Sequence, residues 1–379
     1  MENFSYFNPT RIVFGRGSIA KLPNLIPSTA RILMTYGGGS IRQNGVYDQI
    51  KSALKNRTVL EFGGIEPNPQ FDTCMKAVEI VKAENIDFLL AAGGGSVLDG
   101  TKFIAAAARF GGTDPWDILT GAAVTEAVPM GAVLTLPATG SESNGTAVIS
   151  NSRLNEKLFF GSELTYPKFS ILDPEVTFTL PAGQTANGIV DAFVHVMEQY
   201  MTFDVNAPLQ ERQSEAILST LIQEGPKVLE NPNDYDARAN IMWCACQALN
   251  GLIACGVPQD WASHMIGHEL TALYGIDHAQ SLAIVLPGVL KHQAESKGDR
   301  LLQCGQRVFG MRTKRPESVI RKIESFFLSL GVKTRLKDYN IPARAAKIVA
   351  QRLAARGMRL GEKQDIDADG ISAILKMRR

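Results

Sequence analysis

The stretch IDFLLAAGGGS, residues Ile86–Ser96, has the pattern of a buried strand that ends in a glycine-rich turn, and a helical pattern follows it directly. The same order of strand, polar loop and helix recurs elsewhere in the first half of the chain. The other strands and the helices between them are predicted at Arg31–Tyr36, Gly131–Leu136, Tyr47–Lys55 and Cys74–Glu84. Short apolar strands that alternate with helices predict a parallel α/β sheet.

Each of these strands runs into a loop of glycine and small polar residues. The loops are Gly37–Ser40, Gly93–Ser96 and Pro137–Ser141. In open α/β sheets ligands bind beyond the carboxyl ends of the strands, so we expect the three loops to line a binding site.

From Leu180-Pro181 onward the chain changes character, because helical patterns continue and clear strands disappear. The helices predicted in this part are Ala186–Met201, Leu209–Ile222, Ala237–Ile253, Ala262–Tyr274 and Glu317–Leu330. Strands followed by helices predict an α/β domain over residues 1–180 and an all-helical domain over residues 181–379. A site at the domain junction would unite the loops with polar residues of the helices.

The overall composition excludes several kinds of partner. With 39 basic and 38 acidic residues the formal net charge is +1, which favours neither nucleic acid nor an anionic membrane as partner. The longest apolar runs, such as Phe103–Ala108, are too short to span a bilayer. No signal-peptide pattern is evident at Met1–Phe4, and the five cysteines show neither CxxC spacing nor a disulfide framework. A cytoplasmic protein is therefore expected.

The two GGGS loops are candidates for phosphate binding. Glycine lets the backbone approach an anion closely, and N–H groups at the start of the next helix complete the binding surface. Neither loop matches G-x-G-x-x-G or the Walker A motif, and each one alone is more typical of an ordinary turn. Because the same tetrapeptide occurs twice, both times at a strand end, a nucleotide site is as well supported as two ordinary turns. After the second loop, the predicted helix places Asp99, Thr101 and Lys102 where they are expected to face a bound ligand.

The first loop bears on the choice of coenzyme. Enzymes that select NAD commonly hold the ribose 2′-hydroxyl with a carboxylate at this point of the fold. Here Thr35–Arg42 contains no acidic residue, but it offers glycine N–H groups, the Ser40 hydroxyl and the Arg42 guanidinium. These groups suit a 2′-phosphate, which favours NADP.

Histidine is rare in this chain, and four of the five histidines fall in two short helical patches. Asp191 and His195 are four residues apart and so share one helical face; His264 and His268 repeat this spacing, and His278 follows. One carboxylate and up to four imidazoles suit a divalent metal such as Zn²⁺ or Fe²⁺. Each histidine taken singly is also compatible with an ordinary core or surface position, and we assign no role to His292.

With these motifs in hand, the chain resembles the iron-containing (group III) alcohol dehydrogenases, and within them the NADPH-dependent broad-specificity aldehyde reductase and butanol dehydrogenase branch. The segments that carry the resemblance are Gly63–Pro69, Gly93–Lys102, Thr135–Asn144, Leu172–Pro174, Asp191–Glu198 and Gly256–Gln280. The match is loose over the last fifty or so residues. The resemblance implies a Rossmann-like, mostly parallel dinucleotide-binding α/β domain followed by an all-α metal-binding domain, an architecture like that of dehydroquinate synthase.

The resemblance also implies a role for individual residues. The family's metal ligands fall on Asp191, His195, His264 and His278. His268 matches a family histidine near substrate and nicotinamide; it is our candidate for a proton relay, and the alternative is that it only orients a ligand or packs on the nicotinamide. The implied cofactor contacts are Gly38 and Ser40 at the adenosine phosphate, Asn68 near the adenosine ribose, Gly95, Ser96 and Asp99 along the pyrophosphate and nicotinamide, and Thr135, Thr139, Asn144 and Lys157.

The expected activity is the metal-dependent, NADPH-linked and reversible reduction of aldehydes to primary alcohols. The metal would act as a Lewis acid on the carbonyl oxygen, and the hydride would come from nicotinamide C4. The alternatives are a polyol oxidation like that of glycerol dehydrogenase, a lyase like dehydroquinate synthase, and a non-enzymatic metal- or nucleotide-binding module. Apolar residues surround the histidines, which favours a small uncharged substrate: Phe193, Val194, Trp261, Met265, Ile266, Leu270 and Leu273. A homodimer is implied by the resemblance alone.

Overall fold

The computed structural model describes all residues from Met1 to Arg379, and the chain forms two compact units. One unit, which we call the α/β unit, comprises Phe7–Leu180 and Pro232–Cys246. The other, the helical unit, comprises Met1–Tyr6, Pro181–Asn231 and Gln247–Arg379. No helix is both long enough and apolar enough to cross a membrane.

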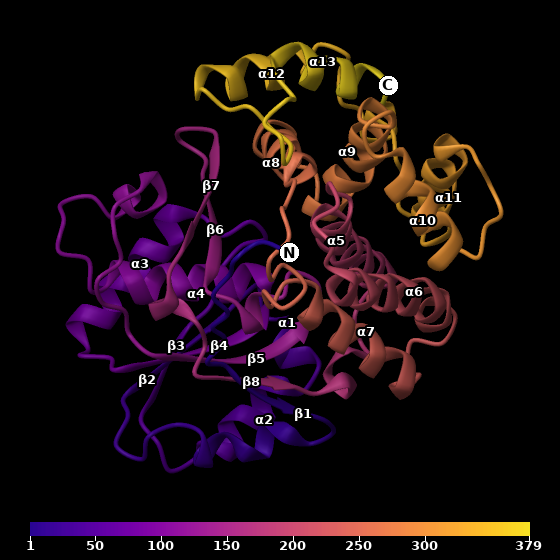
Figure 1. Ribbon diagram of the computed structural model, residues 1–379. Helices are drawn as coiled ribbons and strands as arrows, with labels where there is room; N and C mark the ends of the chain where they lie inside the picture. Colours follow the sequence, from indigo (N-terminus) through magenta and orange to yellow (C-terminus); the bar gives the residue numbers. More distant parts are fainter. The chain divides into compact units, whose positions relative to one another are not determined.

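A six-stranded parallel sheet forms the centre of the α/β unit (Figure 1), in the order β1-β8-β5-β4-β2-β3. Its strands are β1 (Arg11–Phe14), β2 (Ile32–Tyr36), β3 (Val59–Phe62), β4 (Phe88–Gly94), β5 (Met130–Leu136) and β8 (Phe169–Leu172). Leu89–Ala92 in β4 are completely buried, as expected of a parallel strand covered on both faces. The predicted parallel α/β sheet is confirmed.

Two apolar cores cover the two faces of this sheet. Because side chains alternate along a strand, Leu33 of β2 joins one core while its neighbours Ile32 and Met34 join the other. The helices of this unit are α1 (Ser40–Gln43), α2 (Val46–Ala53), α3 (Phe71–Ala83) and α4 (Gly95–Ala107), with 3-10 helices η1 (Ser18–Asn24), η2 (Pro115–Thr120), η3 (Ser141–Ser143), η4 (Glu163–Thr165) and η5 (Pro174–Thr177). The core on the Leu33 side includes Phe103 of α4, and the other includes Ile50 of α2.

The order of the strands places the two GGGS loops side by side. β2 pairs with β4 from Ile32↔Phe88 to Tyr36↔Ala92, so both strands end at the same edge of the sheet. The chain then leaves β2 toward β3 on one side and leaves β4 toward β5 on the other. Such a reversal of direction is the point at which open α/β sheets bind ligands.

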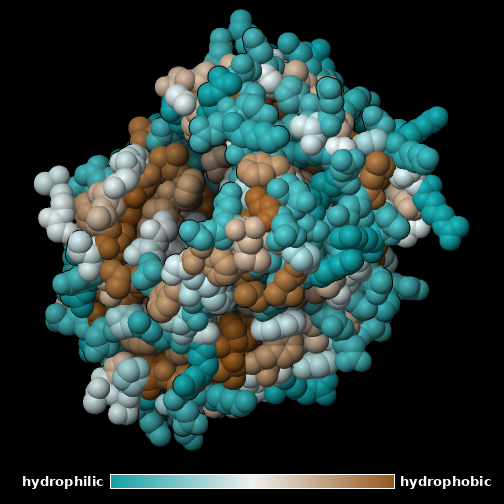
Figure 2. Space-filling model, viewed as in Figure 1, coloured by the Kyte–Doolittle hydropathy of each residue, from teal (hydrophilic) through white to brown (hydrophobic).

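An antiparallel hairpin of β6 (Thr146–Asn151) and β7 (Glu156–Gly161) follows the sheet strand β5. The sequence patterns did not predict it. Leu154 in its turn and Phe159 in β7 are both more than half exposed. Figure 2 shows apolar surface in the part of the view where Figure 1 places this hairpin.

The helical unit contains α5 (Ala182–Tyr200), α6 (Pro208–Glu230), α8 (Ala262–Tyr274), α9 (His278–His292), α10 (Gly298–Arg307), α11 (Pro316–Ser329), the 3-10 helix η6 (Leu336–Tyr339), α12 (Ala345–Ala355) and α13 (Ala368–Lys376). Helix α7 (Tyr235–Ala248) belongs to the α/β unit through Cys246. The predicted α8 has the observed bounds, whereas α5 and α6 are longer than predicted. Apolar residues of α8, α9, α12 and α13 form one shared core, which includes Ile266, Val285, Val349 and Ile374.

A single division after residue 180 would place two segments in the wrong unit. These segments are Met1–Tyr6, which belongs to the helical unit, and Pro232–Cys246, which belongs to the α/β unit. The backbone N–H of Glu2 donates to the carbonyl of Gly256, so the N-terminus joins the helical unit. In α7, Met242 and Cys246 join the core of the α/β unit, and Trp243 packs edge-on against Phe14. Tertiary packing decides both positions, because neither segment carries a local pattern that marks its partner.

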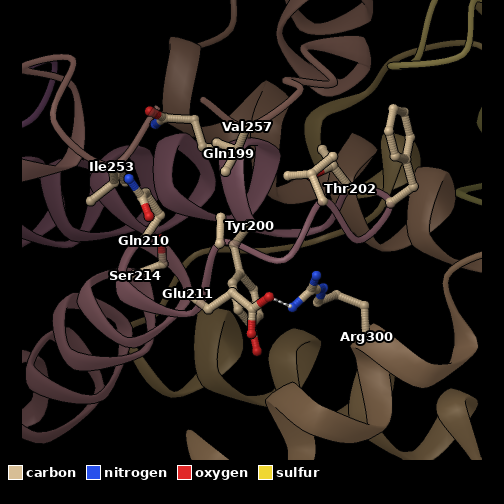
Figure 3. A pocket seen from close by; sticks show the side chains of 12 residues that line it. Gln199, Tyr200, Thr202, Gln210, Glu211, Ser214, Ile253, Val257 and Arg300 are labelled. Atoms are coloured by element: carbon tan, nitrogen blue, oxygen red, sulfur yellow. Dashed lines mark ion pairs between the residues drawn. The ribbon is translucent and has the colours of Figure 1, made fainter. Parts of the chain in front are cut away.

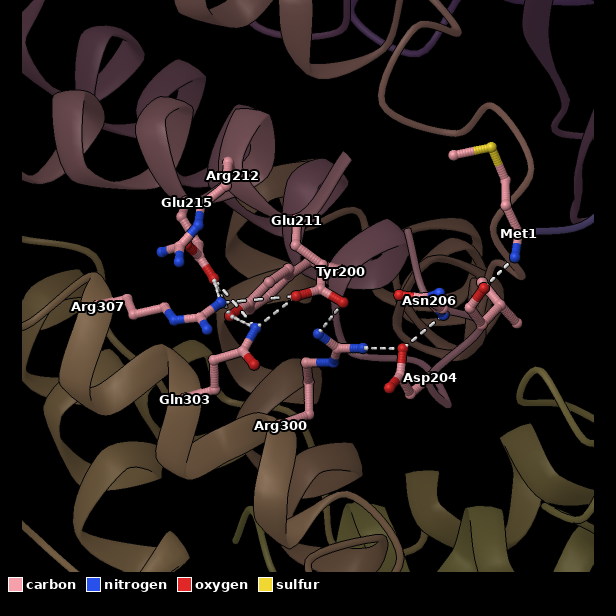
Figure 4. A network of polar contacts seen from close by, with 11 residues as sticks. Met1, Tyr200, Asp204, Asn206, Glu211, Arg212, Glu215, Arg300, Gln303 and Arg307 are labelled. Carbon is pink, nitrogen blue, oxygen red and sulfur yellow. Dashed lines mark hydrogen bonds and ion pairs between the residues drawn. The ribbon is translucent and has the colours of Figure 1, made fainter. Parts of the chain in front are cut away.

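Side chains of α5, α6 and α10 are joined by a polar network (Figure 4). The Tyr200 hydroxyl donates to Glu215 at 2.9 Å, Arg307 pairs with the same carboxylate at 3.0 Å, and Arg300 pairs with Glu211 at 2.7 Å. A cavity of about 20 Å³ lies beside this network (Figure 3), lined among others by Tyr200, Glu211 and Arg300. It has room for about one water molecule, and none of the five histidines lines it.

Candidate metal and cofactor sites

Helix α5 presents Asp191 and His195 from one face, because the two residues are four apart. Both are buried, and Nδ1 of His195 lies 3.9 Å from Oδ1 of Asp191. Burial lowers the pKa of His195 to about 4. A neutral imidazole is the form that binds a metal, so His195 is a ready ligand near neutral pH.

Helix α8 adds His264 to this pair. The rings of His195 and His264 stack with their centroids 4.5 Å apart. One ligand atom each from Asp191, His195 and His264 lies within 4.8 Å of the other two, and all three residues are buried. Residues from two helices therefore converge on one point.

His278 and His268 complete the cluster. His278 begins α9, and its Nε2 lies 3.8 Å from Oδ1 of Asp191. His268 is one turn beyond His264, with its ring centroid 5.1 Å from that of His278 and 6.2 Å from that of His264. His292 lies elsewhere, close to Gly370 at the start of α13.

The donor set suits a divalent metal. Four ligands at ordinary zinc distances stand about 3.4 Å from one another in a tetrahedron. The two distances from Oδ1 of Asp191, 3.9 Å to His195 and 3.8 Å to His278, are only slightly longer. The residues therefore fit Zn²⁺ or Fe²⁺, and the assignment of Asp191, His195, His264 and His278 as ligands stays a prediction.

Glu198 also belongs to this cluster, although the sequence patterns did not indicate a role for it. It follows His195 by three positions on α5, and its buried carboxylate contacts Nδ1 of His264. Burial, reinforced by the nearby Asp260, raises its pKa well above the usual value when no metal is bound, and a divalent cation held by His264 would favour the ionised carboxylate. A signal was available in the sequence, since a histidine that binds a metal usually has a carboxylate or carbonyl partner for its other nitrogen.

The first GGGS loop leads from β2 into the short helix α1, which begins at Ser40. Gly39 has φ +100°, a conformation that favours glycine, whereas a Cβ at Gly38 would meet nothing within 4 Å. The Arg42 guanidinium lies over the Tyr47 ring at 3.9 Å and donates to the Tyr36 hydroxyl and Glu61. The loop thus has open space around Gly38. The guanidinium of Arg42 follows the loop and is held in place by Tyr36, Tyr47 and Glu61.

The second loop is packed tightly. A Cβ at Gly95 would lie 2.4 Å from Oγ1 of Thr139, and one at Gly93 would lie 2.5 Å from Cγ2 of Val97. Steric fit alone therefore requires glycine at both positions. Helix α4 begins at Gly95 without a side-chain cap, so its first N–H groups remain suited to an anion.

Three of the predicted cofactor residues, Asn68, Ser96 and Lys157, are linked by hydrogen bonds. The Asn68 N–H donates to Oγ of Ser96 at 3.2 Å, and Nζ of Lys157 donates to Oδ1 of Asn68 at 2.9 Å. The N–H of Ser141 donates to Oγ1 of Thr139 at 3.2 Å. Thr135 lies buried near the end of β5, on the strand that leads to this loop.

Thr101 and Lys102 do not have the expected open position, whereas the cofactor contact of Asp99 stays a prediction. Both oxygens of Asp99 accept hydrogen bonds within the unit, from Ser141 Oγ at 2.6 Å and the Val148 N–H at 3.0 Å. Thr101 and Lys102 have no exposed surface. The expectation that these side chains face a ligand is wrong for Thr101 and Lys102, because α4 turns them into the core.

Lys102 instead organises the segment after β5. Its ammonium donates to Oδ1 of Asn144 at 2.9 Å and to the carbonyl of Thr146 at 2.8 Å. The amide of Asn144 in turn donates to the carbonyl of Gly140. Glu142 in the same segment is fully buried, and burial raises its pKa to about 7.

Two family models match the chain. The model described as iron-containing alcohol dehydrogenase matches residues 9–174, and the C-terminal model of the Fe-containing alcohol dehydrogenase family matches residues 185–378. The NADPH-dependent aldehyde reductase YqhD of Escherichia coli is 54% identical over 97% of both chains. Its crystal structure superimposes with a TM-score of 0.98 at 52% identity, covering 100% of this chain and 99% of that one. The NADH-dependent butanol dehydrogenase A of Thermotoga maritima has a TM-score of 0.96 at 37% identity, with coverage of 100% and 99%.

Proposed function

Because the chain belongs to the iron-containing alcohol dehydrogenase family, we propose that it reduces aldehydes to primary alcohols with NADPH, in a reversible reaction. The observation that carries the proposal is the buried cluster of Asp191, His195 and His264, together with His278. A relative with more than half of its residues identical is named as an aldehyde reductase, which supports the direction of the reaction.

A divalent metal at this cluster supplies Lewis-acid polarisation of the substrate carbonyl, and NADPH supplies the hydride. The protein's own residues hold the ligand atoms in place from three helices, α5, α8 and α9. Burial of Asp191, His195 and His264 keeps bulk water away from these atoms. His268 lies beside His278 and is proposed to pass a proton to the former carbonyl oxygen of the substrate, which completes the alcohol; its alternative role is to orient a ligand or pack on the nicotinamide.

NADP is the proposed coenzyme for a local reason as well. The Gly37–Ser40 loop contains no carboxylate to bind a ribose 2′-hydroxyl, and Arg42 lies two residues beyond it. The family alone does not decide the choice, since the Thermotoga relative is named as NADH-dependent.

Polyol oxidation and a dehydroquinate-synthase-like lyase are the alternatives that share this architecture. Neither alternative is favoured by the relatives, which are named as an aldehyde reductase and a butanol dehydrogenase. The test is to follow NADPH absorbance with the purified, metal-analysed protein in the presence of butanal, glycerol or no substrate. Consumption with butanal is expected; oxidation of glycerol with no activity on butanal would overturn the proposal.

Two further properties are proposed on narrower support. A homodimer is proposed from the family resemblance, and light scattering of the purified protein tests it. A cytoplasmic location is proposed because all five cysteines are buried and free of disulfides. Cell fractionation tests this location.

A further inference from the structure

We propose that Glu198 is a positioning residue of the metal site, whose carboxylate fixes both the His264 ring and the first turn of helix α8. The inference rests on the proposed metal-dependent function. Glu198 stands on α5, the helix that carries Asp191 and His195, but it reaches across to α8. One residue thereby ties a ligand on α8 to the helix that carries two others.

The contacts of the carboxylate use both oxygens. Oε1 accepts the backbone N–H of Ser263 at 2.6 Å and that of His264 at 3.2 Å. Oε2 contacts Nδ1 of His264. The Glu198 and His264 side chains are 3% and 7% exposed, so water does not replace these contacts.

Helix α8 needs such a partner because of how it begins. The first N–H groups of a helix have no partner within the helix. Trp261 at the N-cap adopts a left-handed conformation with φ +60° and forms no side-chain cap. Asp260 accepts the N–H of Ala262 at 2.8 Å, and Glu198 accepts the next two N–H groups. A negative charge at this end of a helix is also favoured by the helix dipole.

The contact with Nδ1 decides which ring nitrogen of His264 can bind a metal. A carboxylate that accepts the Nδ1 proton leaves Nε2 as the ligand atom. The same contact sets the rotation of the ring, which stacks on His195 at 4.5 Å. Partners of this kind typically change metal affinity by roughly 10- to 100-fold.

Asp260, Lys297 and Glu362 form a further set of contacts next to Glu198. The N–H of Asp260 donates to the backbone carbonyl of Glu198 at 2.9 Å. Nζ of Lys297 pairs with the Asp260 carboxylate and lies 2.9 Å from that of Glu362. All three side chains are at most 4% exposed. The Lys297 cation compensates the two acids, so Asp260 can remain beside Glu198 at a tolerable electrostatic cost.

The test compares Glu198→Gln with the wild type and with Glu215→Gln. Glutamine keeps the size of the side chain and one oxygen for the α8 N–H groups, but it removes the charge from Nδ1 of His264. Glu215 is a matched control, because it is also a buried carboxylate. It belongs to the polar network of α5, α6 and α10, and it contacts Tyr200 and Arg307. The metal-free proteins are titrated with Co²⁺ and with Zn²⁺ against a chromophoric chelator, and the Co²⁺ absorption spectrum is recorded.

We expect Glu198→Gln to weaken metal binding by roughly 10- to 100-fold and to change the Co²⁺ spectrum, with partial recovery in Glu198→Asp. Glu215→Gln is expected to leave both unchanged. If a folded Glu198→Gln protein has the metal affinity and the Co²⁺ spectrum of the wild type, Glu198 only caps helix α8. That outcome would overturn the inference. If instead the wild type binds metal, the variant weakens it and butanal is not reduced, the inference stands and the proposed function fails. A wild type that binds neither metal overturns both.

A second measurement covers the case in which Glu198→Gln does not fold. The ¹⁵N-histidine spectrum of the Zn²⁺-loaded wild type reports which ring nitrogen of His264 carries the proton, and the His264 signals are assigned by comparison with His264→Ala. A proton on Nδ1 is expected. A neutral His264 with its proton on Nε2 would overturn the inference, because Glu198 would then not be accepting from that ring.

Discussion

Nε2 of His278 lies 3.8 Å from Oδ1 of Asp191, although the two residues belong to different helices, α9 and α5. This proximity places His278 rather than His268 beside the carboxylate, whereas the spacing of the histidines left both open. It leads to the first prediction. His278→Ala and His264→Ala should each lose bound metal and lower kcat/KM for butanal by at least about 100-fold, since one of the metal's ligands is removed.

The matched control for this prediction is His292→Ala, because His292 lies near Gly370 and outside the cluster. It should retain metal and turnover. Metal content by elemental analysis and the NADPH assay give the two readouts. Full turnover by metal-free His264→Ala protein would rule out the metal-dependent mechanism.

The second prediction concerns coenzyme choice. Gly38→Asp should shift the NADPH-to-NADH ratio of kcat/KM toward NADH by about tenfold or more, which is about 1.4 kcal/mol, because a carboxylate repels the 2′-phosphate. Gly38 is the suitable position because a Cβ there meets nothing within 4 Å, whereas Gly39 has φ +100° and any side chain would strain it. Gly38→Asn, of the same size but neutral, is the control. A wild-type preference for NADH would contradict the interpretation of this loop.

The third prediction concerns packing at the second loop. Gly95→Ala should destabilise the protein by about 1–3 kcal/mol and weaken coenzyme binding, because its Cβ would lie 2.4 Å from Oγ1 of Thr139. Thr139→Ala in the same chain removes that atom and should recover part of the loss. Gly111→Ala, where a Cβ meets nothing within 4 Å, is the control. Thermal unfolding and coenzyme titration measure the effects, and equal losses with and without Thr139→Ala would show that the clash is not the cause.

The fourth prediction is a pH dependence that comes from Glu142. Burial raises its pKa to about 7 from an ordinary value of 4.5, so the folded protein binds more protons between these values and loses stability as the pH rises through them. Glu142→Gln removes this term. The stability of the variant relative to the wild type should therefore increase from about pH 5 to about pH 8, by up to roughly 3 kcal/mol.

Thermal midpoints of both proteins across this pH range test the prediction. Any loss of packing or hydrogen bonding in the variant shifts its thermal midpoint by a similar amount at every pH. The prediction is therefore tested by how the difference between the two midpoints changes with pH. Glu163→Gln, at an exposed position of the same unit, is the control. A difference that does not change with pH would mean that Glu142 is ionised in the folded protein throughout.

Much of the fold is local in origin and was predictable. The parallel sheet was expected from strands such as Gly131–Leu136, and α8 was expected with its observed bounds, because alternation and helical periodicity are properties of neighbouring residues. The hairpin of β6 and β7 was missed. Its pairing depends on contacts such as Ile149 with Leu158 across a turn rather than on a buried apolar run.

The sequence by itself determined the candidate ligands, because a spacing of four residues places Asp191 and His195 on one face of any helix they occupy. It likewise determined the GGGS loops and the family to which the chain belongs. Only the tertiary structure decided which side chains work together. Glu198 meets His264 and Lys102 meets Asn144 across long stretches of chain, and Lys102 lies in the core although its helix begins at a loop expected to bind a ligand. The physical reason is that such contacts depend on how whole helices and strands pack, and the packing minimises the free energy of the entire core rather than that of any local segment.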